Sequence, residues 1–104
     1  MNNVANPPPR PDRWRPGWDV TVRRAGLLAD LGLALVALGR SSRLVLESSG
    51  QVALSVPDER GPLAVAVVQD ARGGWAYVWG AAARYPAGAD GTRHAASALA
   101  AGTR

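Results

Sequence analysis

The spacing of the apolar residues changes once along the chain, after Gly39, and this change limits the folds that the chain can form. Before that point the apolar residues recur every three or four positions, the interval at which side chains share one face of a helix. After it they alternate with polar residues or form short runs between turn residues, as β-strands do. The chain is therefore expected to begin with a helix and to continue with a sheet. The helical spacing is carried by Leu27, Leu31, Leu35 and Leu38.

The first helix is predicted at residues 20–38, between two terminal signals. Asp19 is a typical helix N-cap, and Gly39 suits the left-handed position that commonly ends a helix. One small sheet cannot cover every apolar side chain of this helix, so an exposed apolar face and a homodimer are expected. The apolar residues beside the leucine stripe are Leu28, Leu33 and Val36.

Four strands are predicted after this helix, joined by short turns. Residues 63–69 are almost all apolar, which predicts a central strand covered on both faces. The short connections between consecutive strands favour an antiparallel meander. The strands are expected at residues 43–47, 51–56, 63–69 and 75–79.

A second, alanine-rich helix is predicted at residues 92–101, after a loop at residues 80–91 that contains Pro86. The sequence therefore predicts an α+β fold of the order α-β-β-β-β-α: a four-stranded antiparallel meander with two helices packed on one face. A chain of 104 residues has room for one domain, which we place at residues 19–104. The residues of the second helix expected to face the sheet are Ala95, Ala98 and Leu99.

Residues 1–18 are expected to form a disordered arm, because its prolines prevent helix and sheet from propagating. Arg13, Trp14 and Arg15 interleave guanidinium and indole groups in this arm. Such an arm can contact phosphates by charge and bases by stacking, or it can be a solvated tail. All twelve basic residues are arginine, and the net charge of +4 is compatible with an acidic partner without requiring one.

Three aromatic side chains, Trp75, Tyr77 and Trp79, alternate along the fourth predicted strand and therefore share one face of it. If that face is exposed, the rings form a platform for nucleic-acid bases or a patch for a protein partner. If it is covered, the rings pack beneath the helices and supply the volume that an alanine-rich core lacks. Both interpretations remain open from sequence.

Residues 23–39 also carry some features of a signal peptide. Arg23 and Arg24 precede an apolar run that ends in a small-x-small pattern, whereas Asp30 and the proline-rich leader argue against secretion. The same run is too short to span a bilayer, which requires about 20 apolar residues.

The aromatic strand and the segment after it carry a loose motif: Trp75-Ala76-Tyr77-Val78-Trp79-Gly80, then Tyr85-Pro86-Ala87, Asp90, Ala95-Ala96 and Ala98. This motif resembles that of a group of short, uncharacterised actinobacterial proteins. That resemblance implies an α+β fold and a cytoplasmic protein. Members of the group are often encoded near helix-turn-helix regulators, which implies a role as an accessory to a regulator. Ala81-Ala82-Ala83-Arg84 stands where relatives often carry an acidic residue, so a partner bound through that acid is in doubt here.

No catalytic or metal-binding pattern stands out. His94 is the single histidine, and Asp90, His94 and Ser97 lie too close in sequence, without a nucleophile elbow, to indicate a triad. The chain has no cysteine. We therefore expect no enzyme activity, no metal and no cofactor.

The function expected from the sequence is a non-enzymatic interaction module, an accessory to a regulator that binds a protein partner or itself. The alternative is a nucleic-acid-binding module that uses the arm and the aromatic strand face. The expected site residues are Trp75, Tyr77, Trp79, Arg13, Trp14 and Arg15, and neither a membrane nor a small-molecule substrate is expected as partner.

Overall fold

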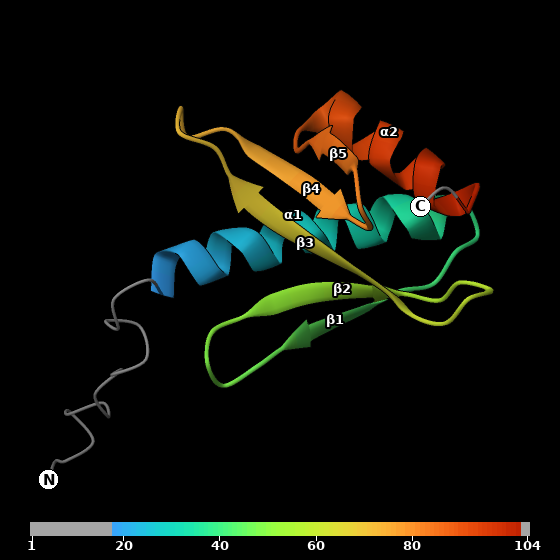
Figure 1. The fold of residues 1–104 in the computed structure, drawn as a ribbon, viewed down its shortest axis with the longest axis horizontal. Helices are drawn as coiled ribbons and strands as arrows, with labels where there is room; N and C mark the ends of the chain where they lie inside the picture. Colours follow the sequence, from blue (N-terminus) through green and yellow to red (C-terminus); the bar gives the residue numbers. More distant parts are fainter. Residues whose placement is uncertain (1–17, 103–104) are drawn as a thin grey trace, which may run out of the picture.

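The computed structural model describes residues 18–102, which form a five-stranded sheet and two helices (Figure 1). The fold is α+β, as predicted, but it contains five strands where four were expected. Both helices contribute side chains to one hydrophobic core on a single face of the sheet. The elements are α1 (Trp18–Ala37), β1 (Arg43–Leu46), β2 (Val52–Val56), β3 (Leu63–Gln69), β4 (Trp75–Trp79), β5 (Ala83–Pro86) and α2 (Ala89–Ala100).

The strands form an antiparallel meander in the order β1-β2-β3-β4-β5. Leu44 lies opposite Leu54, which in turn lies opposite Val65, so these three side chains share the face that carries the helices. On the other half of the sheet Val67 lies opposite Tyr77, and Tyr77 lies opposite Tyr85. This register gathers the larger apolar and aromatic side chains of the sheet on the helix-bearing face.

Helix α1 ends in the way that the sequence predicted. Gly39 has a φ of 79°, and the N–H groups of Gly39 and Arg40 donate to the carbonyls of Val36 and Leu35. These two bonds form a Schellman motif. The start of the helix differs from the prediction, because Trp18 is already helical and Asp19 lies in the first turn. An acidic side chain in the first turn stabilises the helix by interacting with the positive end of the helix dipole, although it is not the N-cap.

The core uses a narrower face of α1 than the sequence predicted. Leu38 lies in the turn after the helix and is largely exposed, so the expectation that it joins the core is wrong. Leu28 is fully buried, whereas Leu33 and Val36 are 69% and 63% exposed. The helix residues in the core are Leu27, Leu28, Leu31 and Leu35, so this segment is an integral part of the folded domain.

Strand β3 is the middle strand of the sheet, but it is covered on one face only. Val65 and Val67 are buried beneath the helices, whereas Ala64 is exposed and Val68 is half-buried on the opposite face. The expectation of cover on both faces is therefore wrong for the described residues. The expectation came from the apolar run at residues 63–69. Two of its residues on the uncovered face, Ala64 and Ala66, are alanines, and exposing such small side chains to water costs little free energy.

Strand β5 occupies part of the segment predicted as a loop. Gly80, with a φ of 62°, helps to turn the chain back so that Ala83 lies opposite Trp79. Pro86 is tolerated because β5 is an edge strand, where the missing N–H need not enter the ladder. Tyr85 stacks on Trp79, with ring centroids 5.1 Å apart and an interplanar angle of 9°.

Helix α2 begins three residues earlier than predicted. Ala95 and Leu99 are buried as expected, whereas Ala96 is buried and Ala98 is only half-buried.

Candidate interaction surface

The aromatic ladder of β4 belongs to the core and not to the surface. Tyr77 is fully buried and Trp79 is 3% exposed. The interpretation of the ladder as an exposed recognition face is therefore wrong for these two residues. The physical reason is that α1 and α2 are rich in leucine and alanine, and the rings fill the space between helices and sheet.

Trp75 is the member of the ladder that stays partly exposed. The guanidinium carbon of Arg24 lies 5.7 Å from the centroid of its ring, in reach of a cation–π contact. The Nε of Arg24 is buried without a hydrogen-bond partner among the described residues. Trp75 thus contacts Arg24 within the chain while part of its side chain stays accessible. The other expected site residues, Arg13, Trp14 and Arg15, lie outside the described residues.

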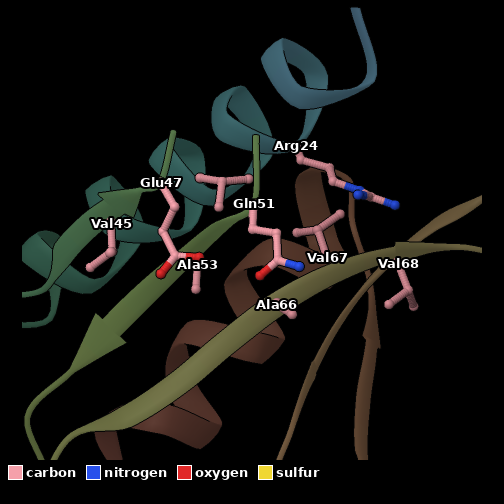
Figure 2. Close-up of a pocket in the computed structure, with 9 residues that line it drawn as sticks. Arg24, Val45, Glu47, Gln51, Ala53, Ala66, Val67 and Val68 are labelled. Atoms are coloured by element: carbon pink, nitrogen blue, oxygen red, sulfur yellow. The ribbon is translucent and has the colours of Figure 1, made fainter. Parts of the chain in front are cut away.

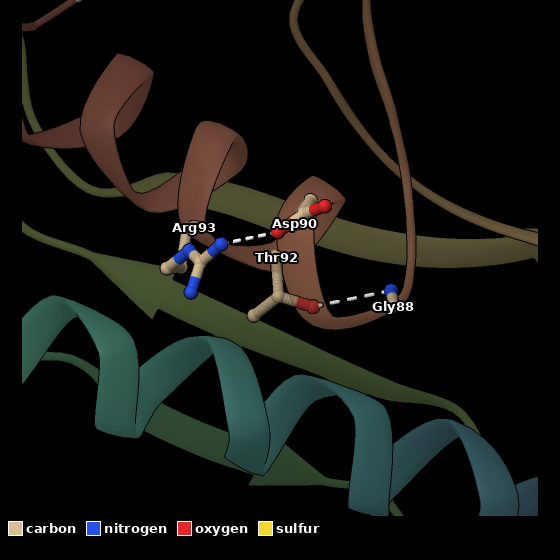
Figure 3. Close-up of polar contacts among 4 residues, drawn as sticks. All are labelled: Gly88, Asp90, Thr92 and Arg93. Atoms are coloured by element: carbon tan, nitrogen blue, oxygen red, sulfur yellow. Dashed lines mark hydrogen bonds and ion pairs between the residues drawn. The ribbon is translucent and has the colours of Figure 1, made fainter.

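The polar residues at the start of α2 make two separate local contacts (Figure 3). The Asp90 carboxylate pairs with the Arg93 guanidinium three residues later. Thr92 accepts a hydrogen bond from the Gly88 N–H at 3.3 Å, and His94 is exposed. Among residues 18–102, no three His, Cys, Asp or Glu side chains lie together in a way that could hold a metal ion.

The most unusual part of the described surface is apolar and lies along α1 and β1. On α1 the outward residues recur at helical intervals and so form one stripe. On β1 all four residues are exposed, although three of them are apolar. We call this region the α1–β1 surface, and its apolar members are Val22, Ala29, Leu33, Val36, Leu44 and Leu46. The exposed side chain of Val45 lies on the opposite face of the sheet.

Helix α1 and strand β1 are held side by side by contacts at both ends. The Thr21 hydroxyl donates a 3.1 Å hydrogen bond to the Gly50 carbonyl, just beyond the end of β1. At the other end, a Cβ added to Gly32 would lie 3.1 Å from the Ser42 hydroxyl oxygen, so the backbone of α1 approaches closely there. Helix and strand therefore run antiparallel and side by side, so the exposed apolar residues of α1 lie on the same side of the sheet as Leu44 and Leu46.

Strand β1 is also a free edge of the sheet. The Glu47 N–H donates to the Gln51 carbonyl at 2.9 Å, which fixes the phase of the β1–β2 ladder. Because hydrogen-bonded positions alternate along an antiparallel strand, Arg43 and Val45 bond toward β2. The N–H and C=O groups of Leu44 and Leu46 then point away from the sheet. Within residues 18–102, no strand pairs with this side of β1.

A hollow of about 430 Å³ is lined by residues of β1, β2 and β3, on the side of β1 away from its free edge (Figure 2). Val45 and its cross-strand neighbour Ala53 lie in its wall, together with small apolar side chains of β3. Glu47, Gln51 and Arg24 supply its polar rim. Its lining has one acidic and one basic side chain and no Ser, Thr, Cys or Lys side chain. We therefore regard it as a surface depression beside β1 and β2.

The sequence indicated part of this surface, because it placed a strand at residues 43–47 and surplus apolar residues on α1. The predicted meander also set this first strand at an edge of the sheet. The sequence did not indicate that the edge and the apolar stripe of α1 would be left uncovered, since cover depends on tertiary packing.

In comparisons with known proteins, the chain matches no protein-family model, no curated protein and no solved structure. Neither of the two described helices has the length and apolar character needed to cross a membrane.

Proposed function

We propose that this chain is a non-enzymatic interaction module that binds a protein through the α1–β1 surface. The observation that supports this function is the coincidence of exposed leucines and valines with an unpaired strand edge. Exposed apolar patches and bare edges each favour association, and proteins that stay monomeric usually protect both with charged or covering groups. Here neither Leu33 nor Leu46 is covered by any described part of the chain.

Protein binding is better supported than nucleic-acid binding. Stacking on bases requires exposed rings, and Tyr77 and Trp79 are buried. The cytoplasmic location and the role beside a helix-turn-helix regulator, which the resemblance implies, remain part of the proposal and rest on the resemblance alone.

Site-specific cross-linking in the native host tests the proposed function. A photoreactive amino acid in place of Leu33 should give a covalent protein adduct, because this position lies in the α1–β1 surface. The matched control places the same group at His94, which is exposed on α2. Equal labelling from both positions, or none from Leu33, contradicts the proposal.

A further inference from the structure

We infer that the partner of the α1–β1 surface is a second copy of this chain, joined by antiparallel pairing of two β1 strands about a two-fold axis at Val45. This inference rests on the proposed function, because it uses the same surface and names its occupant. The resulting dimer would have one continuous ten-stranded sheet with all four helices on the same face.

The backbone of β1 is compatible with this pairing. The free N–H and C=O groups of the edge belong to Leu44 and Leu46. A two-fold axis at Val45 sets Leu44 of each copy opposite Leu46 of the other. Both outward-pointing residues of each strand are then hydrogen-bonded, and the two copies of Val45 form a close, non-hydrogen-bonded pair.

The charges of the strand select this register over its neighbours. With the axis at Val45, Arg43 of each copy lies opposite Glu47 of the other, so the contact contains two opposite-charge pairs. Axes at Leu44 or Leu46 also satisfy the outward backbone groups, but they set Arg43 or Glu47 opposite Val45. Opposite charges across a strand pair stabilise it, so the arrangement centred on Val45 is favoured.

Strand pairing alone is too small to hold two copies together. Four residues of strand extend about 13 Å, whereas a stable interface covers about 800 Å² on each partner. Helix α1 supplies the missing area. It packs over β1, β2 and β3, so in the dimer the two copies of α1 would lie about three strand spacings, roughly 14 Å, apart. Leu33, Val36, Leu44 and Leu46 of both copies would fill the space between them.

A cysteine at the axis tests the register directly. The chain contains no cysteine, so Val45→Cys introduces the only thiol. Non-hydrogen-bonded partners have Cα atoms about 4.5 Å apart, within the range that a disulfide bridges. Mild oxidation of the full-length V45C variant should give a disulfide-linked dimer in high yield. The control is Ala64→Cys, which is exposed on the same sheet face two strands away and should remain mostly unlinked.

A charge exchange tests the same contact without a covalent bond. Arg43→Glu and Glu47→Arg each replace two attractive pairs by two repulsive ones, so each should raise the dimer dissociation constant about tenfold at low salt. The double variant R43E/E47R restores opposite charges and should restore dimerisation. All of these side chains are exposed, so the fold of the monomer should be unaffected.

The results separate the inference from the proposed function. A wild-type chain that stays monomeric at high concentration, while Leu33 cross-links to a different protein, overturns the dimer and leaves the interaction module standing. A dimer in which V45C does not link and R43E/E47R does not recover overturns the β1 pairing. A monomer without any Leu33 adduct contradicts both.

Discussion

The Tyr77 hydroxyl donates a 2.8 Å hydrogen bond to the main-chain carbonyl of Leu27, fifty residues earlier in the chain. Its oxygen also lies 3.1 Å from the Thr92 hydroxyl. Because the phenol has a single proton, Thr92 must donate to Tyr77, and the Thr92 oxygen in turn accepts from the Gly88 N–H. One buried side chain of β4 thus ties α1 to the start of α2.

Removing the Tyr77 hydroxyl should destabilise the fold, because it removes the hydrogen bonds that connect α1 to the start of α2. Tyr77→Phe keeps the ring but loses both hydrogen bonds, and the expected loss of unfolding free energy is about 1–3 kcal/mol. Urea unfolding of the wild type and the variant measures it. Tyr85→Phe is the matched control, since it keeps the stack on Trp79 and should cost less. Equal losses in both variants would contradict the role given to the Tyr77 hydroxyl.

The same phenol should make the protein sensitive to alkaline pH. Burial raises the pKa of Tyr77 above its ordinary value of 10.0; the Thr92 hydrogen bond opposes this rise and the Asp30 charge adds to it. Below pH 10 the group is protonated in both states and its effect on stability is constant. Above pH 10 the unfolded chain ionises first, so the free energy of unfolding should fall with pH, by up to about 1.4 kcal/mol per unit. Unfolding curves between neutral and strongly alkaline pH test this, and the fall should be smaller in Tyr77→Phe.

Alanine substitutions at two leucines of the sequence stripe should have different effects on stability, because the structure buries one of them and exposes the other. Leu31 is fully buried, so Leu31→Ala should cost about 2–5 kcal/mol of unfolding free energy. Leu38 belongs to the same sequence stripe but lies about half-exposed in the turn, so Leu38→Ala should cost less than about 1 kcal/mol. Thermal or urea unfolding gives both values. Similar losses would indicate that Leu38 packs in the core after all.

Replacing two glycines at the start of α2 by alanine should change the stability of the protein by different amounts. A Cβ at Gly91 would lie 1.9 Å from the Pro86 carbonyl oxygen, which forces β5 and α2 apart. Gly91→Ala should therefore destabilise the fold by about 1–3 kcal/mol. Gly88 has an extended backbone and open space around it, so Gly88→Ala should change stability little. A neutral Gly91→Ala variant in chemical unfolding would refute the close contact between β5 and α2.

Arg40 should hold the end of α2 in place. Its guanidinium donates to the Ala100 carbonyl at 2.7 Å and to the Pro57 carbonyl at 2.9 Å, and so bridges α2 and the turn after β2. Arg40→Ala should cost about 1–3 kcal/mol and increase amide hydrogen exchange in the last turn of α2. Arg60→Ala, an exposed arginine in the neighbouring turn, is the control. Unchanged exchange in Arg40→Ala would contradict this role.

Much of the fold could be predicted from local pattern. The positions of α1 and of the first four strands follow from hydrophobic spacing and from turn residues, because both depend on neighbouring residues only. The hairpin before β4 is an example: the Asp70 carboxylate accepts hydrogen bonds from the Arg72 and Gly74 N–H groups, and Gly73 adopts a φ of 87°. Strand β5 was missed because Ala83 and Pro86 carry no strand signal, and pairing with β4 makes the segment extended.

The candidate site could be predicted less well, for a physical reason. The alternation of Trp75, Tyr77 and Trp79 determined that the rings share a face, but periodicity is the same whether that face meets water or a helix. The packing of α1 and α2 decided that Tyr77 and Trp79 are core residues. The sequence by itself thus determined every element except β5, and which residues share a face of each. Only the tertiary structure decided which apolar face was left uncovered, because burial depends on contacts between segments distant in the chain.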